Sequence, residues 1–304
     1  MGVKGLYSYL KHYRNHIDLD HLPLEVGPLR IGIDAMSILY RMKGNTGEII
    51  GLIKGLKSHG HRILFVFDGK PPAEKEREIQ SRRDAKESAA AHAIALESFL
   101  KTDEAATMSI RDREILQTTL ARAKTEAWHM TRDLRKAFQE LLWTEQIPYV
   151  KSVSEADDVL IDLINGGKLD VIMSSDMDYL LGGTPRLWIP TNKATNYFEE
   201  VLLADVLDGE GFSAAAFLDG CLLCGTEERE GAKGVPPHIA FGWIRHYGSL
   251  EGLLKSNITD TTFRKMFPTV EAIAVARATV VAQEPYSRIR SDHLERVREF
   301  IDGL

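Results

Sequence analysis

Short apolar runs alternate with helical patterns along the chain. The runs cover residues 29–34, 62–68, 147–150 and 169–174. Each is short and almost continuously hydrophobic, which is typical of strands that are buried on both faces. Residues 35–58 and 154–165 instead place apolar side chains at helical spacing, which predicts one helix in each segment. The alternation predicts an α/β fold with a mostly parallel central sheet flanked by helices.

A long segment from residue 72 to about 145 has no strand pattern. It is rich in Ala, Glu, Lys and Arg, and apolar residues recur at helical spacing only in its later part, WHMTRDLRKAFQELLW. We therefore predict helices that do not belong to the sheet. Residues 111–136 contain seven Lys and Arg against four Asp and Glu, which favours a nucleic-acid surface. A solvated helical insertion is the alternative.

Composition limits the class of protein. A chain of 304 residues, 44% hydrophobic and 27% charged, can bury a large core as one domain, with or without a smaller appendage. No apolar stretch reaches the about 18 residues that a membrane crossing needs, and MGVKGLYSYL lacks a signal-peptide core. We expect an intracellular protein, nuclear or cytoplasmic, that does not contact a membrane.

Two further features of the composition carry little functional information. Cys221 and Cys224 lie on an apolar stretch, where packing in the core is expected and a redox pair is the alternative. The net charge of −6 gives no global sign of nucleic-acid binding.

Carboxylates follow the predicted strands. Six of them are candidates for one site: Asp34, Asp68, Glu155, Asp157, Asp176 and Asp178. Asp34, Asp68 and Asp176 come after apolar runs, and the carboxyl ends of parallel strands form the crevice where ligands bind. Glu155 and Asp157 begin the helix at 154–165, where a single acid is usually only a cap.

A carboxylate cluster of this density stays ionised only when cations neutralise it. Ligands that are all oxygen favour Mg²⁺ or Mn²⁺, and two such ions are typical of phosphodiester hydrolysis. From the spacing of the acids alone, a phosphatase is the alternative.

Six motifs in order carry a family resemblance: MGVKGLYSYL, IDAMSILY, VFDGKPP, SEADD, SSDMD and FLDGCLLCG. Together they resemble the flap endonuclease branch of the structure-specific 5′ nuclease (XPG/Rad2-like) superfamily. The resemblance covers most of the chain up to about residue 255 and indicates a compact member, viral or otherwise divergent. It implies cleavage of 5′ flaps and 5′–3′ exonuclease activity by two Mg²⁺ ions, for which Mn²⁺ can substitute, in DNA replication, repair or recombination.

The resemblance also implies roles for individual residues. The six acids would be metal ligands, and the seventh family position holds Glu227, where the family ordinarily has Asp. Lys75 and Arg82 match a basic pair that contacts the scissile phosphate, although both are also compatible with solvated charges. Tyr40 matches an aromatic residue on which a base stacks, with a core position as the alternative. Gly2 matches a small residue beside the active site.

The resemblance divides the chain into a nuclease core at 1–215 and a helical duplex-binding region at 216–304. The insertion at about 72–145 would be the arch through which a 5′ strand passes, and 231–254 a helix–turn–helix unit of the helix-hairpin-helix kind. In that unit GVPPH replaces a Gly-apolar-Gly turn, so we expect a weakened potassium site, with Lys233 and His238 as phosphate contacts.

The expected partner is branched DNA with a 5′ flap, bound by a monomer. REFIDGL shows no sliding-clamp motif. Three alternatives stay open: a Holliday-junction resolvase, a mainly exonucleolytic relative and a catalytically silent DNA-binding scaffold.

Overall fold

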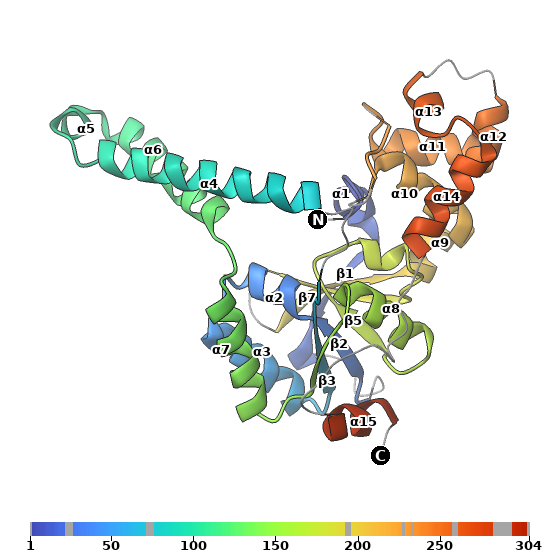
Figure 1. The fold of residues 1–304 in the computed structure, drawn as a ribbon, viewed down its shortest axis with the longest axis horizontal. Helices are drawn as coiled ribbons and strands as arrows, with labels where there is room; N and C mark the ends of the chain where they lie inside the picture. The colour runs from blue at the N-terminus through green and yellow to red at the C-terminus, as the bar shows by residue number, and fades with distance from the viewer. Residues whose placement is uncertain are drawn as a thin grey trace. The chain divides into compact units, whose positions relative to one another are not determined.

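A computed structural model describes residues 2–21, 27–70, 76–191, 196–226, 229–232, 234–256, 261–281 and 294–302. The chain forms two compact units (Figure 1). The larger unit contains residues Met1–Lys70 and Phe138–Leu304, and the smaller unit contains Pro71–Ala137.

A seven-stranded sheet is the centre of the larger unit, with the strand order β1-β7-β6-β5-β2-β3-β4. The strands are β1 (Arg14–Asp18), β2 (Arg30–Asp34), β3 (Arg62–Phe67), β4 (Tyr149–Lys151), β5 (Val171–Met173), β6 (Arg186–Pro190) and β7 (Tyr197–Leu202). Strands β2 to β6 are mutually parallel, whereas β7 runs antiparallel to β6 and β1 antiparallel to β7. The predicted α/β class with a mostly parallel sheet is confirmed.

Helices cover both faces of this sheet. Helices α2 (Ala35–Arg41), α3 (Thr46–Ser58), α7 (Arg132–Thr144) and α8 (Ala156–Asn165) pack on its central strands, and α9 (Leu203–Glu210) and α15 (Leu294–Asp302) also contact strands. Helices α10 (Ala214–Cys224), α11 (Pro237–Tyr247), α12 (Leu250–Lys255) and α14 (Val270–Val281) pack on one another instead, and the remaining helices are α1 (Leu6–Tyr9) and α13 (Thr261–Met266). No described helix is both long enough and apolar enough to span a lipid bilayer.

Strand β3 shows why both faces are buried. Side chains alternate between the two faces along a strand, and residues 63–67 of β3 are all apolar and buried. Phe65 and Phe67 pack edge-on or tilted against Phe138 of α7, with ring centroids 5.4 and 5.8 Å apart. Leu64 and Val66 belong to the hydrophobic core that contains α8. Helix α7, which the sequence placed outside the sheet region, therefore covers one face of the sheet with its later half.

The pattern from 35 to 58 is not one helix, so that prediction was wrong. Helix α2 ends at Arg41, and Lys43 and Gly44 take positive φ values of 48° and 67°. Asn45 then begins α3, accepting hydrogen bonds from the amides of Gly47 and Glu48. Turn geometry and a new N-cap interrupt a helical apolar pattern that continues on both sides.

The smaller unit is a helical hairpin. Helices α4 (Glu76–Phe99) and α6 (Ile110–Ala127) lie side by side and are joined through α5 (Asp103–Thr107) (Figure 1). Among its described side chains, the buried ones are alanines: Ala93, Ala105 and Ala123. Small side chains allow the helices to approach closely, so the hairpin has little apolar core of its own.

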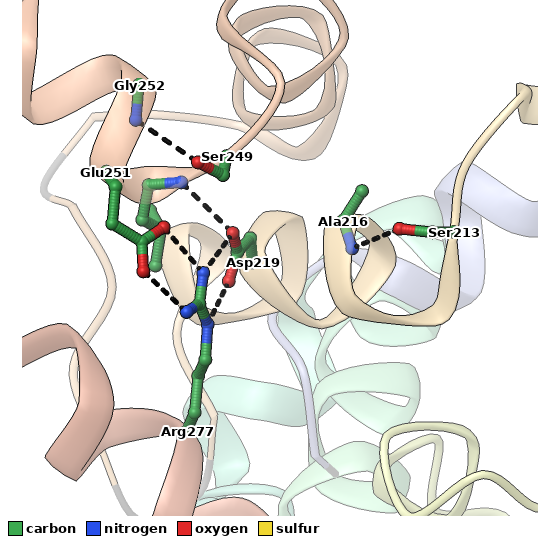
Figure 2. A network of polar contacts seen from close by, with 8 residues as sticks. Ser213, Ala216, Asp219, Ser249, Glu251, Gly252 and Arg277 are labelled. Atoms are coloured by element: carbon green, nitrogen blue, oxygen red, sulfur yellow. Dashed lines mark hydrogen bonds and ion pairs between the residues drawn. The ribbon is translucent and has the colours of Figure 1, made fainter.

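An ion-pair network joins three helices of the C-terminal region. Figure 2 shows the Arg277 guanidinium of α14 between Asp219 of α10 and Glu251 of α12. The guanidinium donates to both Asp219 oxygens, at 2.8 and 2.7 Å, and to both Glu251 oxygens, at 2.6 and 2.8 Å. Asp219 also accepts the Leu250 amide at 3.0 Å and is only 1% exposed. Asp219, the aspartate of FLDGCLLCG, is thus a structural residue.

Arg277→Ala should lower the free energy of unfolding by about 3–5 kcal/mol, because it leaves the buried Asp219 carboxylate without its cation. Urea denaturation followed by circular dichroism measures this loss. Arg245→Ala is the control: its partner Glu210 keeps hydrogen bonds from the hydroxyls of Tyr9 and Tyr13, so we expect a loss of about 1 kcal/mol or less. Equal losses in the two variants would contradict a structural role for the network.

Candidate active site

The acids gather where three neighbouring parallel strands end. Strands β5, β2 and β3 are adjacent in the sheet, and all three run in the same direction. Asp34 is the last residue of β2, Asp68 follows the end of β3, and Asp176 lies in the loop after β5. The sheet order therefore brings together three carboxylates that are distant in sequence.

Asp34 is held by hydrogen bonds to both of its oxygens. Its Oδ1 caps α2 by accepting the Ser37 amide at 2.9 Å. Its Oδ2 accepts the Ser174 hydroxyl at 2.9 Å and the Tyr179 hydroxyl at 3.3 Å. Burial raises the pKa of Asp34 to about 7, and the nearby charge of Asp68 adds to this shift. The carboxyl group is therefore fixed in one orientation within strong negative potential.

Backbone amides orient the other aspartates in a similar way. Oδ1 of Asp68 accepts the amide of Ala156, the first residue of α8, at 2.9 Å. Oδ1 of Asp176 accepts the Asp178 amide at 3.0 Å, and Oδ1 of Asp178 accepts the Val3 amide at 2.7 Å. The N-terminal segment therefore meets loops from the middle of the chain at these carboxylates.

Gly2 lies directly against two of the acids. Its φ is +83°, and a Cβ atom there would be 2.2 Å from Oδ1 of Asp176 and 2.7 Å from Oδ1 of Asp178. Such distances are far shorter than van der Waals contact, and a positive φ is itself unfavourable for a residue with a side chain. Only glycine fits this position without displacing the N-terminal segment.

Tyr179 lies beside the acids, next to Asp34, and is fully buried. Burial raises the pKa of its hydroxyl well above the usual value, and four nearby charges contribute: Asp34, Asp157, Asp176 and Asp68. The hydroxyl therefore stays protonated and remains a hydrogen-bond donor to Asp34 Oδ2. The four carboxylates must all lie near this one side chain to act on it.

The remaining candidates occupy different positions. Glu155 is the N-cap residue of α8, makes no side-chain cap hydrogen bond, and directly precedes the Ala156 amide that binds Asp68. Tyr40 is 41% exposed on α2, which excludes the core alternative for its ring. His238 is exposed in the first turn of α11, and Arg82 lies on α4 of the smaller unit. Three candidates fall outside the described residues: Lys75, Glu227 and Lys233.

The turn before α11 contains prolines as well as a glycine, as its sequence GVPPH indicates. Gly234 has a φ of +81°, and Pro236 has a φ of −75° and precedes Pro237, the first residue of α11. The Val235 amide donates to the Ala232 carbonyl at 3.0 Å. Whether this turn binds a potassium ion stays a prediction.

The chemistry of the acid cluster fits a hard divalent cation. Its donors are carboxylate oxygens, and burial together with the charge of Asp68 raises the pKa of Asp34. Within the described ranges, however, no three His, Cys, Asp or Glu side chains form a group that could hold a metal ion as they stand. One oxygen of each of Asp34, Asp68, Asp176 and Asp178 faces a backbone amide instead.

Sequence reasoning missed Tyr179, Ser174 and Ser37. All three are hydrogen-bonding residues next to or within the motifs that carry the acids, which is the only signal that could have indicated them. The Ser174 hydroxyl joins Asp34 to the backbone by also accepting the Asp176 amide at 3.1 Å. The Ser37 hydroxyl accepts the Ser175 amide at 2.8 Å and so fixes the loop after β5. These residues hold the acids and the adjoining loop in place, and they are not candidate metal ligands themselves.

Tyr179→Phe should weaken Mn²⁺ binding by about 10-fold or more, because it removes one hydrogen bond that orients Asp34 and preserves the packing of the ring. Isothermal titration calorimetry measures the affinity directly. Tyr13→Phe is the matched control. It also removes a tyrosine hydroxyl that donates a hydrogen bond to a carboxylate, but this carboxylate is Glu210, which does not belong to the cluster. Unchanged Mn²⁺ affinity in Tyr179→Phe would show that its hydroxyl does not position a ligand.

Comparisons with known proteins agree with this arrangement. A family model of the XPG I-region matches residues 146–227, which include Glu155, Asp157, Asp176 and Asp178. Flap endonuclease 1 of Theileria annulata is 29% identical over 277 residues, which cover 84% of the chain and 52% of that relative. The chain thus spans about half the length of this relative.

Two solved structures have the same fold. Flap endonuclease-1 from Methanococcus jannaschii superposes with a TM-score of 0.60 at 21% identity, over 99% of the chain and 93% of that structure. The catalytic core of Rad2 in complex with DNA substrate gives a TM-score of 0.63 at 19% identity, over 99% and 94% of the two chains.

Proposed function

Because the chain belongs to the flap endonuclease branch of the XPG/Rad2 superfamily, we propose that it is a metal-dependent, structure-specific nuclease that cuts branched DNA carrying a 5′ flap. One observation carries the proposal: Asp34, Asp68, Asp157 and Asp176 gather around Tyr179 at the carboxyl edge of the sheet. A related solved structure, the catalytic core of Rad2, is in complex with a DNA substrate, which supports DNA as the ligand.

Two Mg²⁺ ions, or Mn²⁺ in their place, would supply the activation of water and the stabilisation of the leaving oxygen. The six acids Asp34, Asp68, Glu155, Asp157, Asp176 and Asp178 would hold these ions, with Glu227 as a weaker seventh. The hydroxyls of Ser174 and Tyr179 donate hydrogen bonds to Oδ2 of Asp34 and so hold this oxygen in place. The amides of Ala156, Asp178 and Val3 fix one oxygen on each of three further acids.

The remaining candidate residues would contact DNA. We assign Lys75 and Arg82 to the scissile phosphate and Tyr40 to stacking on a base, a contact worth about 1–3 kcal/mol per base. The exposed ring of Tyr40 is compatible with this role. Lys233 and His238, both within the helix–turn–helix unit at 231–254, would contact duplex phosphates. This unit belongs to a helical region from 216 to 304 that follows a nuclease core at 1–215. We expect the chain to act as a monomer inside the cell.

A substrate comparison tests the proposal. Cleavage rates are measured in Mg²⁺ on a double-flap duplex, a nicked duplex and a four-way junction, with Asp176→Ala as the inactive reference. We expect the double flap to be cut at least about 10-fold faster than the junction, with incision one nucleotide into the duplex. A preference for the junction would favour a resolvase, and no cleavage of any substrate would favour a binding scaffold.

A blocked flap should reveal whether the insertion at about 72–145 is an arch that the 5′ strand enters. A bulky group attached to the 5′ end before the enzyme is added should slow cleavage at least about 10-fold, because a free end must pass through. The same group attached after binding should have little effect. Single-turnover rates in the two orders of addition measure this difference, and equal rates would leave α4 and α6 as a solvated helical insertion.

A further inference from the structure

The N-terminal segment, residues 2–9, connects the acid cluster to helix α11. At one end, the Val3 amide donates to Oδ1 of Asp178 at 2.7 Å, and Gly2 lies against the same carboxylate. At the other end, helix α1 contacts α11. Because α11 lies in the unit proposed to bind duplex DNA, the segment physically joins that unit to the proposed metal centre.

Two contacts hold the N-terminal segment on α11. The ring of Tyr9 stacks on the ring of Phe241, with centroids 4.7 Å apart and planes inclined by 12°. Gly5, directly before α1, packs on Pro237, the first residue of α11. The φ of Gly5 is +75°, and a Cβ atom there would be 3.0 Å from Cγ of Pro237, which is shorter than ordinary van der Waals contact. A glycine therefore lets the segment approach α11 closely.

The segment between the acids and α11 is short and internally hydrogen-bonded. The Leu6 amide donates to the Val3 carbonyl at 3.2 Å, and the Tyr9 amide donates to the Gly5 carbonyl at 3.0 Å. Leu6 is fully buried. A hydrogen-bonded turn has few dihedral angles that can change independently, so we expect a displacement of α1 to move Val3 as well.

The orientation of Asp178 depends on this segment. Because Oδ1 of Asp178 bonds to the Val3 amide, the position of Val3 sets the orientation of the whole carboxylate. Tyr9 itself contacts protein at both ends of its side chain, since its ring packs on Phe241 and its hydroxyl donates to Glu210 at 2.6 Å. Any effect of Tyr9 on bound ions must therefore pass through the N-terminal segment.

We propose that Tyr9 is a positioning residue for the metal centre. By stacking on Phe241, it holds the N-terminal segment where the Val3 amide orients Asp178. The inference rests on the proposed function, because it requires the acids to bind divalent ions. Helix α11 then supports the metal centre in addition to its proposed contacts with duplex DNA.

Isothermal titration calorimetry with Mn²⁺, in the absence of DNA, tests the proposal. Tyr9→Leu keeps an apolar side chain but removes the stacked ring, so Mn²⁺ should bind at least about 5-fold more weakly, as for other groups that orient metal ligands. Tyr9→Phe keeps the ring and should restore the wild-type affinity. Phe212→Leu is the matched control, because Phe212 is also buried against Phe241, with centroids 5.6 Å apart, and its loss leaves the Tyr9 stack in place.

The resonance of the Val3 amide in ¹⁵N-labelled, metal-free protein gives a second readout. This amide reports its own hydrogen bond to Asp178, which a general loss of stability in the folded chain would not change. We expect the resonance to shift in Tyr9→Leu and to stay in place in Tyr9→Phe and Phe212→Leu. Neither readout needs cleavage, so a chain that binds Mn²⁺ without cutting DNA would contradict the nuclease activity alone.

Two results would overturn the inference. Unchanged Mn²⁺ affinity with an unshifted Val3 resonance in Tyr9→Leu would mean that other contacts hold the segment, such as the bond from the Lys4 amide to the Gly225 carbonyl at 3.0 Å. An equal loss of Mn²⁺ affinity in Phe212→Leu would mean that looser packing around Phe241, and not the stack on Tyr9, disturbs the acids.

Discussion

Alanine at Asp176 or Asp178 should abolish cleavage of flap DNA while leaving the affinity for that DNA unchanged or higher. Each substitution removes a carboxylate of the proposed metal centre and also a negative charge that faces the phosphate backbone. We expect cleavage rates at least about 100-fold below wild type, since even indirect partners of metal ligands contribute about 10–100-fold. Single-turnover cleavage and fluorescence anisotropy measure the two effects separately.

Asp170→Ala is the matched control for these variants. Asp170 directly precedes β5 and pairs with Arg30, so the same chemical change is made at the other end of the same strand. Its cleavage rate should stay within a few-fold of wild type. If Asp176→Ala and Asp178→Ala cut within tenfold of wild type in saturating Mg²⁺, the assignment of these residues to a two-metal centre is wrong.

Gly2→Ala should reduce cleavage more than about 10-fold, although only one methyl group is added. The new Cβ would overlap the Oδ1 atoms of Asp176 and Asp178, so either these carboxylates or the N-terminal segment must move. Movement of the segment would also break the hydrogen bond from the Val3 amide to Asp178. A displacement of about 1 Å near a reacting centre can cost about 100-fold in rate.

Gly211→Ala separates this steric effect from backbone strain. Gly211 has a φ of +70°, close to the value at Gly2, but a Cβ there would meet nothing within 4 Å. Both variants carry the cost of a positive φ, of about 1 kcal/mol, and only Gly2→Ala disturbs the acids. A similar loss of cleavage in both variants would mean that strain, and not contact with the carboxylates, is responsible.

The sequence predicted the central strands well because their physical signal is local. Residues 31–33 of β2 and 63–67 of β3 are buried on both faces of the sheet, and an aspartate ends β2 and follows β3. Strands β1, β6 and β7 were missed, although β6 is largely buried. Strand β1 reads RNHID and is not fully buried at any position, so its pairing with β7 depends on contacts between distant segments.

The site was predicted in part for the same reason. The acids occupy strand ends and helix starts, which sequence patterns locate, but their convergence near Tyr179 depends on the strand order β5-β2-β3. The metal-binding role of the acids stays a prediction until ions are measured.

The cleavage rate of a double-flap duplex as a function of Mg²⁺ concentration tests the central claim most directly. If the acids form a two-metal nuclease centre, the wild-type chain should give no product in EDTA. At low Mg²⁺ the rate should rise with about the second power of its concentration, as expected for two ions. Product in EDTA, or a wild-type rate in Mg²⁺ from the Asp176→Ala variant, would contradict it.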